Sequence, residues 1–178
     1  MLFVVLLIIV VWAVMVYNSL VSLRNKVKEG FSTMDVFMKK RFDLIPNLVQ
    51  TVKGYASHEA EVLEKVVALR NGASSMEAKL EADKQISQAL RNLYVQVEAY
   101  PELKASQNFL NLQDQLQHVE EDIANARRYY NGCVRIYNTK IEQFPGVLIA
   151  NLFHFSQSDM YEVADAAERE NVKVDFSK

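Results

Sequence analysis

The sequence predicts an all-α protein in which an N-terminal transmembrane helix is followed by an up-and-down four-helix bundle with long, coiled-coil-like helices. Three observations point to this fold class. An uncharged apolar segment opens the chain. Apolar residues then recur at spacings of three and four over most of the remaining length. Only five of the 178 residues are glycine and three are proline, which favours long helices joined by short turns.

The first segment has the length and composition of a membrane anchor. Every side chain from Met1 to Tyr17 is apolar or aromatic, and the first charged side chain is Arg24. As a helix, the 23 residues before Arg24 span about 34 Å, enough to cross a hydrocarbon core. The basic start and the small-residue cleavage site of a signal peptide are not visible, so we expect the anchor to be retained. Arg24, Lys26 and Lys28 follow it, which predicts a cytoplasmic location for the remainder and an outside N-terminus.

A long apolar stripe follows the anchor on one face of a helix. Its members are Val27, Phe31, Met34, Met38, Ile45, Leu48, Val52, Tyr55, Val62, Val66 and Leu69. Pro46 lies inside this stripe, although a proline in a helix interior costs about 3 kcal/mol. The stripe keeps its phase across Pro46, and Ile45 would be a poor N-cap for a new helix. We therefore expect one kinked helix that continues to Asn71-Gly72.

Further helices are expected downstream of this first one. The run Ser74-Ser75-Met76-Glu77 offers a capping box for a second helix, which stops before Pro101. A third helix ends at Pro145-Gly146, and a short apolar helix follows from Val147 to Phe155. A last helix is expected from about Met160 to Arg169.

The predicted organisation has three parts. Residues 1–23 form the anchor, and residues 24–170 form the helical domain. Within that domain, residues 24–45 are a membrane-proximal stalk and residues 46–170 are the bundle. Residues 171–178 form an extended tail.

Several stretches resemble the LemA family of bacterial membrane-anchored proteins. They are RFDLIPNLVQTVKGYASHE (41–59), EAYPELKASQNF (98–109), LQDQLQHVEEDIANARRYYN (112–131), YNTKIEQFP (137–145) and VKVDF (172–176). The resemblance covers nearly the whole chain in order. It implies a single-pass protein of the bacterial cytoplasmic (inner) membrane with a four-helix bundle on the cytoplasmic side. It implies no reaction, because the family has no established catalytic activity.

The composition and motifs give little support to catalysis. The net charge of −2 offers no case for a nucleic-acid partner, and the single cysteine, Cys133, cannot form an intrachain disulfide. No phosphate-binding loop, nucleophile elbow or Cys/His cluster occurs, so we expect no enzyme and no cofactor. The zinc-protease spacing fails because position 62 is valine. A weaker metal site, and with it a metal-dependent hydrolase, would use His58 with His118 and a nearby glutamate, Glu61 or Glu121.

Two apolar seams are expected to lack cover within the chain. If the first turn falls near residues 72–75, the second helix reaches only the height of Pro46, and the third helix extends past the end of the first. The uncovered seam residues are then Val27, Phe31, Met34 and Met38 at one end and Tyr130, Tyr137, Ile141 and Phe144 at the other. Exposed apolar seams favour a homo-oligomer. The heptad repeat Tyr130-Asn131 and Tyr137-Asn138 is typical of core packing with a register role, and a tyrosine-lined ligand pocket is the alternative.

Arg41 interrupts the apolar stripe beside the expected turn at Pro101. A guanidinium that faces a core must be paired, and the same register predicts Glu98 or Glu102 as its partner. The alternative is that the kink at Pro46 rotates Arg41 into solvent.

The functional hypothesis is a non-catalytic, membrane-anchored structural or interaction protein that self-associates. Its expected partners are the lipid bilayer, further copies of the chain and a membrane protein of unknown identity. The alternative is a receptor-like adaptor that recruits a protease or transporter at the membrane.

Overall fold

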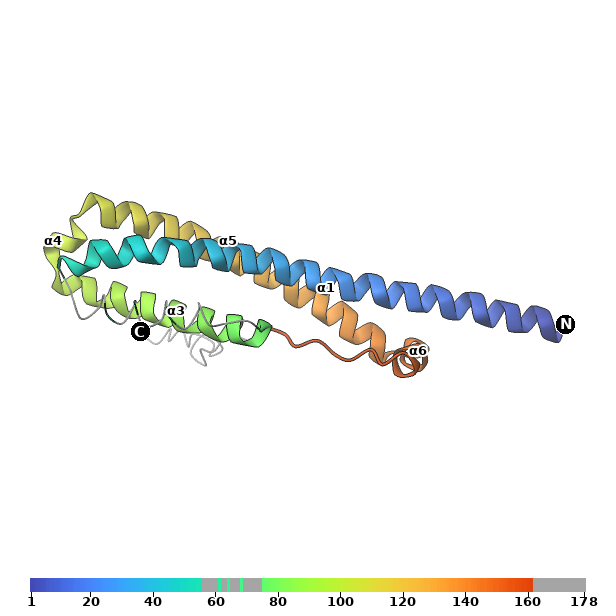
Figure 1. Cartoon of the computed structure of the whole chain (residues 1–178). Coiled ribbons are helices and arrows are strands. Elements are labelled where there is room, and N and C mark those ends of the chain that lie inside the picture. Colours follow the sequence, from blue (N-terminus) through green and yellow to red (C-terminus); the bar gives the residue numbers. More distant parts are fainter. Residues whose placement is uncertain (56–60, 62–63, 65–67, 69–74, 162–178) are drawn as a thin grey trace, which may run out of the picture. The chain divides into compact units, whose positions relative to one another are not determined.

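The structure is a computed structural model that describes residues 1–55, 61, 64, 68 and 75–161 (Figure 1). Within these residues the regular elements are α1 (Leu2–Lys53), α3 (Met76–Gln96), the 3-10 helix η1 (Val97–Ala99), α4 (Pro101–Lys104), α5 (Gln107–Glu142) and α6 (Gly146–Leu152). No strand occurs in this described part, which confirms the all-α class. The four-helix count stays a prediction.

Helix α1 runs through Pro46 without a break, as expected from the phase of its apolar stripe. It ends at Lys53, however, well before Asn71-Gly72. The amide of Tyr55 donates to the carbonyl of Val52 at 2.9 Å and closes the final turn. Lys53 Nζ then lies 3.5 Å from Glu64 Oε1, whereas 11 further residues of straight helix would separate these residues by about 16 Å. The chain therefore reverses after Lys53, and the predicted end of the first helix is wrong.

The next helices agree closely with the sequence pattern. Ser75 caps α3 by accepting a hydrogen bond from the amide of Ala78 at 3.1 Å. The backbone amide of Glu77 and the Ser75 hydroxyl lower the pKa of the Glu77 carboxyl, because hydrogen bonds to both favour its ionised form. Helix α3 and η1 end before Pro101, and α5 ends shortly before Pro145.

The chain divides into two units. The first contains Met1–Leu44 and Leu112–Met160; the second contains the described part of Ile45–Asn111, together with Tyr161. The core of the second unit includes Ile45, Leu48, Val52, Ile86, Leu90, Leu93, Val97, Leu103 and Phe109. It also buries Asp83, to which the Tyr161 hydroxyl donates at 3.2 Å. The domain boundaries expected from the sequence stay predictions.

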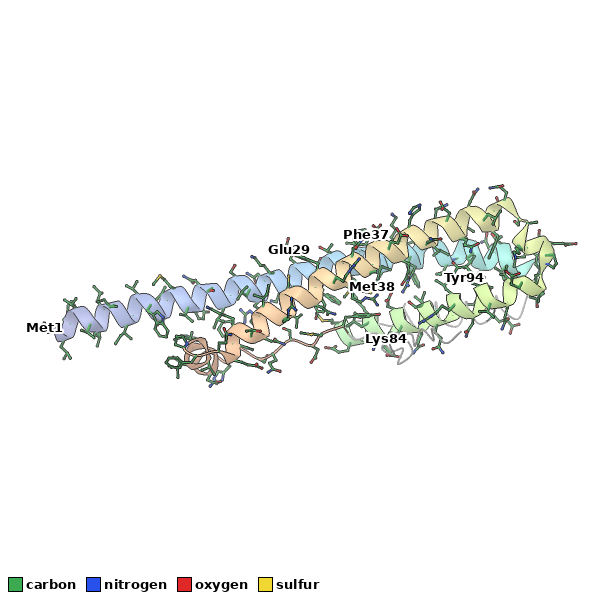
Figure 2. The ribbon with its side chains drawn as sticks, turned by 180° about the vertical axis from the view of Figure 1, so that it is seen from behind. Met1, Glu29, Phe37, Met38, Lys84 and Tyr94 are labelled. Atoms are coloured by element: carbon green, nitrogen blue, oxygen red, sulfur yellow. The ribbon has the colours of Figure 1, made fainter. Side chains whose placement is uncertain are left out.

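In the first unit, α1 packs antiparallel to α5. Gly30 lies against Tyr130, and Arg41 contacts Glu120, so the residue numbers rise along α1 as they fall along α5. Figure 2 labels Glu29 and Met38 on this stretch of α1. The sequence-based register assumed a parallel arrangement. It is wrong because the reversal after Lys53 adds one change of direction.

The N-terminal end of α1 is uncovered. Every side chain from Met1 to Val11 is exposed, and Leu20 is the first along α1 to be fully buried. Met1 marks the free end in Figure 2. By length and composition, α1 is a candidate membrane-spanning helix.

Helix α6 folds back beside α1 and ends in a Schellman turn. The amide of Phe155 donates to the carbonyl of Ala150 at 2.9 Å, and that of His154 to Asn151 at 3.4 Å. His154 has a φ of 56°, the left-handed conformation that this turn requires. The helix therefore stops at Leu152 rather than Phe155. The last expected helix does not begin by Tyr161, and the rest of it and the tail lie outside the described residues.

Candidate functional site

A glycine brings α1 and α5 into close contact. A Cβ atom added to Gly30 would lie 3.2 Å from Tyr130 Cα and 3.5 Å from the Tyr129 ring. The first of these atoms is backbone and cannot rotate away. Next to this contact the Phe31 and Tyr130 rings pack edge to face, with centroids 6.0 Å apart. Gly30 therefore sets how closely the two helices approach.

Gly30→Ala and Gly132→Ala form a matched pair, since both glycines lie inside helices. Alanine favours a helix over glycine by about 1 kcal/mol. A Cβ at Gly132 meets nothing within 4 Å, so Gly132→Ala should be stabilising by up to about 1 kcal/mol. Gly30→Ala should give no such stabilisation, because its added Cβ crowds the backbone of Tyr130 on α5. Gly30→Val should be destabilising by about 1–3 kcal/mol. Urea denaturation of the detergent-solubilised chain measures all three. Equal gains from both alanine variants would contradict the close contact.

The stripe beside Gly30 is covered within the chain. Val27, Met34 and Met38 are buried, as are Tyr130, Tyr137 and Ile141, while Phe31 is half-buried. The expectation that these seams lack intrachain cover is therefore wrong for most of their length, because α5 runs antiparallel along α1. Phe144 is the exception, since its side chain is 80% exposed. Self-association of the chain stays a proposal.

Three side chains of α5 hold the segment that follows α6. We call Tyr130, Tyr137 and Asn138 the clasp, and Phe155–Met160 the strap. The Tyr130 hydroxyl donates to the carbonyl of Asp159 at 2.8 Å, and that of Tyr137 to Ser156 at 2.9 Å. Asn138 Nδ2 donates to the Ser158 carbonyl at 2.9 Å, and its Oδ1 accepts from the Ser158 amide at 3.0 Å.

The heptad spacing of the two tyrosines matches the strap's backbone. The seven residues from Tyr130 to Tyr137 advance about 10 Å along the helix. The three residues from Ser156 to Asp159 cover about the same distance in an extended chain. All four bonds reach main-chain atoms of the strap, so the clasp recognises an extended backbone rather than particular side chains. Burial raises the pKa of Tyr137, an effect that the Arg24 charge opposes, so its hydroxyl keeps its proton at neutral pH.

Asn138→Ala should release the strap locally. It removes both hydrogen bonds to Ser158, each of which is worth about 1 kcal/mol. The Ser158 amide should then exchange with solvent deuterium faster by a factor of ten or more, which corresponds to about 1.4 kcal/mol or more. Exchange in the middle of α5 should change little. Asn151→Ala is the control, because Asn151 is exposed and outside the clasp. Unchanged exchange at Ser158 would contradict the clasp.

Arg41 is buried and paired, as the sequence analysis expected, but with a different partner. Its side chain is fully buried, and its Nη1 donates to Glu120 Oε2. Glu98 instead pairs with Lys104, at 2.6 Å, and Glu102 is exposed. The partner that the structure shows for Arg41 is thus Glu120, and the predicted pairing with Glu98 or Glu102 stays a prediction. Glu120 reaches Arg41 because α5 lies beside this part of α1.

The weak metal-site alternative gains no support from the described residues. Among them no group of three His, Cys, Asp or Glu side chains could hold a metal ion. His118 is exposed and lies 3.8 Å from Asp114, its neighbour one turn away on α5. His58 lies outside the described residues.

Two residues important for the structure were missed. Gly30 lies within the apolar stripe between Val27 and Phe31, and the small size of glycine was the available signal for a close helix contact. Asp83 lies three residues before Ile86, on the apolar face of α3, where a buried carboxylate needs a partner. The Tyr161 hydroxyl meets that need.

These features define an all-α protein whose candidate N-terminal membrane span continues into a packed antiparallel helix pair. The chain belongs to the LemA family, whose sequence model matches residues 30–176.

Comparison with individual proteins gives similar results. The chain is 29% identical to Protein LemA of Metamycoplasma hominis over 167 residues, which cover 90% of this chain and 74% of the relative. It is 24% identical to Magnetosome protein MamQ 2 of Paramagnetospirillum magneticum, over 85% of this chain and 66% of the relative. Magnetosome protein MamQ of Magnetospirillum gryphiswaldense is 23% identical over the same shares. The chain thus spans about two thirds to three quarters of these relatives.

Proposed function

We propose that the chain is a single-pass protein of the bacterial cytoplasmic membrane that acts by binding other proteins or further copies of itself, without catalysis. The observation that carries this proposal is the exposed apolar N-terminal end of α1, because uncovered side chains from Met1 to Val11 suit lipid and not water. Arg24, Lys26 and Lys28 directly after the span favour an outside N-terminus and a cytoplasmic helical domain.

Self-association would use apolar side chains that the helix pair leaves exposed. Tyr129 and Ile136 are a heptad apart on α5 and are 50% and 56% exposed. Together they form an exposed stripe next to the clasp residues Tyr130 and Tyr137, which are buried within the chain. A second helix could pack on this stripe in the manner of a coiled coil.

The mass of the detergent-solubilised full chain tests this proposal. Light scattering corrected for bound detergent should give a protein mass that is a multiple of 20.4 kDa, the mass of one chain. Ile136→Lys should shift the mass toward one chain, while Val95→Lys, an exposed site on α3, should not. A mass of one chain for the unmodified protein would contradict self-association.

The clasp favours the second candidate, an adaptor that presents or captures an extended peptide. Its donors and acceptor bind main-chain atoms, and such recognition suits any extended segment. A monomeric mass together with a protease or transporter captured from native membranes would support this role. Stoichiometric metal in the purified protein would instead support the hydrolase.

A further inference from the structure

Helix α6 and its flanks present a second apolar surface. No side chain carries a formal charge between Glu142 and Asp159. Within this stretch, Phe144, Leu148 and Leu152 follow one another at intervals of four, so the latter two share a face of α6 and Phe144 precedes it. These side chains are 80%, 55% and 67% exposed, and Phe153 is 53% exposed. We call residues 144–153 the α6 hairpin.

The α6 hairpin lies beside the candidate membrane span. The Phe153 and Tyr17 rings have centroids 4.7 Å apart, and the Phe155 ring lies 5.7 Å from that of Tyr17. The Phe155 ring also contacts Arg24, whose guanidinium carbon lies 5.0 Å from the centre of that ring. Tyr17 precedes Arg24 by about 10 Å along the helix. Phe153 is therefore level with the last uncharged turns of α1. Phe155 lies between Tyr17 and Arg24, the first charged residue of the helix. All of these residues belong to the first unit.

This position places the exposed surface of the hairpin where the membrane ends. Tyrosine and tryptophan side chains, here Tyr17, concentrate at the boundary between hydrocarbon and headgroups, and a cation just beyond them, here Arg24, is typical of that boundary. Asn151 and His154, the exposed polar residues of α6 and its turn, suit the headgroup layer. The hydrocarbon centre is excluded, because α6 has seven residues and is flanked by irregular backbone whose polar groups need partners.

We propose that the α6 hairpin inserts its apolar face into the interfacial layer of the membrane that α1 spans. This inference rests on the proposed function, because it takes residues 1–23 as the anchor. The hairpin then gives the first unit a second membrane contact, which fixes the height and rotation of α1 at its exit from the bilayer. Lipid is favoured over a second copy because the apolar surface of the hairpin is continuous with a helix surface that itself faces lipid.

Tryptophan fluorescence in brominated lipid tests this insertion. Trp12 is the single tryptophan of the chain and lies within the span, so it reports on the anchor. In a Trp12→Phe background, Leu148→Trp and Leu152→Trp report on the hairpin. Val36→Trp is the matched control, since Val36 is 62% exposed but lies about 18 Å beyond Arg24 along α1. Each full-length variant is reconstituted in phosphatidylcholine–phosphatidylglycerol vesicles with brominated or ordinary acyl chains.

Bromine near the glycerol end of the acyl chains should quench tryptophan at 148 and 152, and bromine near their methyl end should quench Trp12, which lies midway along the span. Neither should quench tryptophan at 36. If Trp12 is quenched while both hairpin tryptophans are not, the inference is overturned and the anchor stands. If those tryptophans emit at short wavelength but resist quenching, a second copy covers the hairpin, which also overturns the inference. If Trp12 itself escapes quenching, the anchor fails as well.

Discussion

Glu120→Gln is expected to lower the free energy of unfolding by about 2 kcal/mol. The Arg41 side chain is fully buried and donates to Glu120, so loss of the carboxylate leaves a guanidinium in the helix interface with weaker compensation. A hydrogen bond to a charged group contributes about 1.5–3 kcal/mol. Glu120 is 49% exposed, and solvent screening keeps the effect below the 3–5 kcal/mol of a fully buried pair.

A double-mutant cycle isolates this interaction. Arg41→Met combined with Glu120→Gln should show a coupling energy of about 1 kcal/mol or more, measured by chemical denaturation in detergent. Arg41→Met combined with Glu98→Gln is the control, because Glu98 pairs with Lys104. That second cycle should be additive within about 0.5 kcal/mol. Additivity in the Glu120 cycle would contradict the antiparallel packing of α1 and α5.

Pro46→Ala is expected to raise the free energy of unfolding by up to about 3 kcal/mol. Pro46 lies inside α1, where it removes one helical hydrogen bond to the carbonyl of Phe42 and crowds the preceding turn. Its side chain is exposed, so alanine leaves no cavity. Alanine also gives the unfolded chain more freedom, which opposes the gain by about 1 kcal/mol or less.

Pro101→Ala is the matched control for Pro46→Ala. Pro101 lies at the start of α4, where the missing amide hydrogen has no helical acceptor. Its replacement should leave stability unchanged or slightly lower. Unchanged or lower stability of Pro46→Ala in chemical denaturation, as expected for Pro101→Ala, would instead indicate that Pro46 starts a helix.

The helices of this protein were largely predictable because local signals agree with their ends. Ser75 begins α3, Pro101 follows its end, and Pro145-Gly146 follows α5. The continuous path of α1 through Pro46 followed from the phase of the apolar stripe. Apolar spacing is a local property of the sequence, and it keeps its phase across a proline when the helix continues through that residue.

The turn after Lys53 could not be recognised from periodicity. Val52, Tyr55 and Val62 keep the spacing of the stripe across the turn, so the pattern looks continuous. Lys53 followed by Gly54 was the contrary signal, since basic residues and glycine favour helix ends. Missing one reversal changed the expected direction of α5, and with it the partner of Arg41 and the cover of both seams.

The clasp was partly predictable. The repeat of Tyr130 and Tyr137 indicated buried rings whose hydroxyls need partners, and Asn138 indicated a register role. Their partners could not be named, because they are backbone atoms of a strap that has no helical or strand pattern of its own. Gly30 and Asp83 depend on contacts distant in sequence, which spacing does not reveal.

Alkaline carbonate extraction of membranes from cells that express the full chain tests the membrane anchor most directly. The full chain should stay in the sedimented membranes, because an inserted apolar span of this length resists extraction. A variant that lacks residues 1–23 should appear in the supernatant as a strongly helical protein by circular dichroism. Release of the full chain into the supernatant would contradict the anchor.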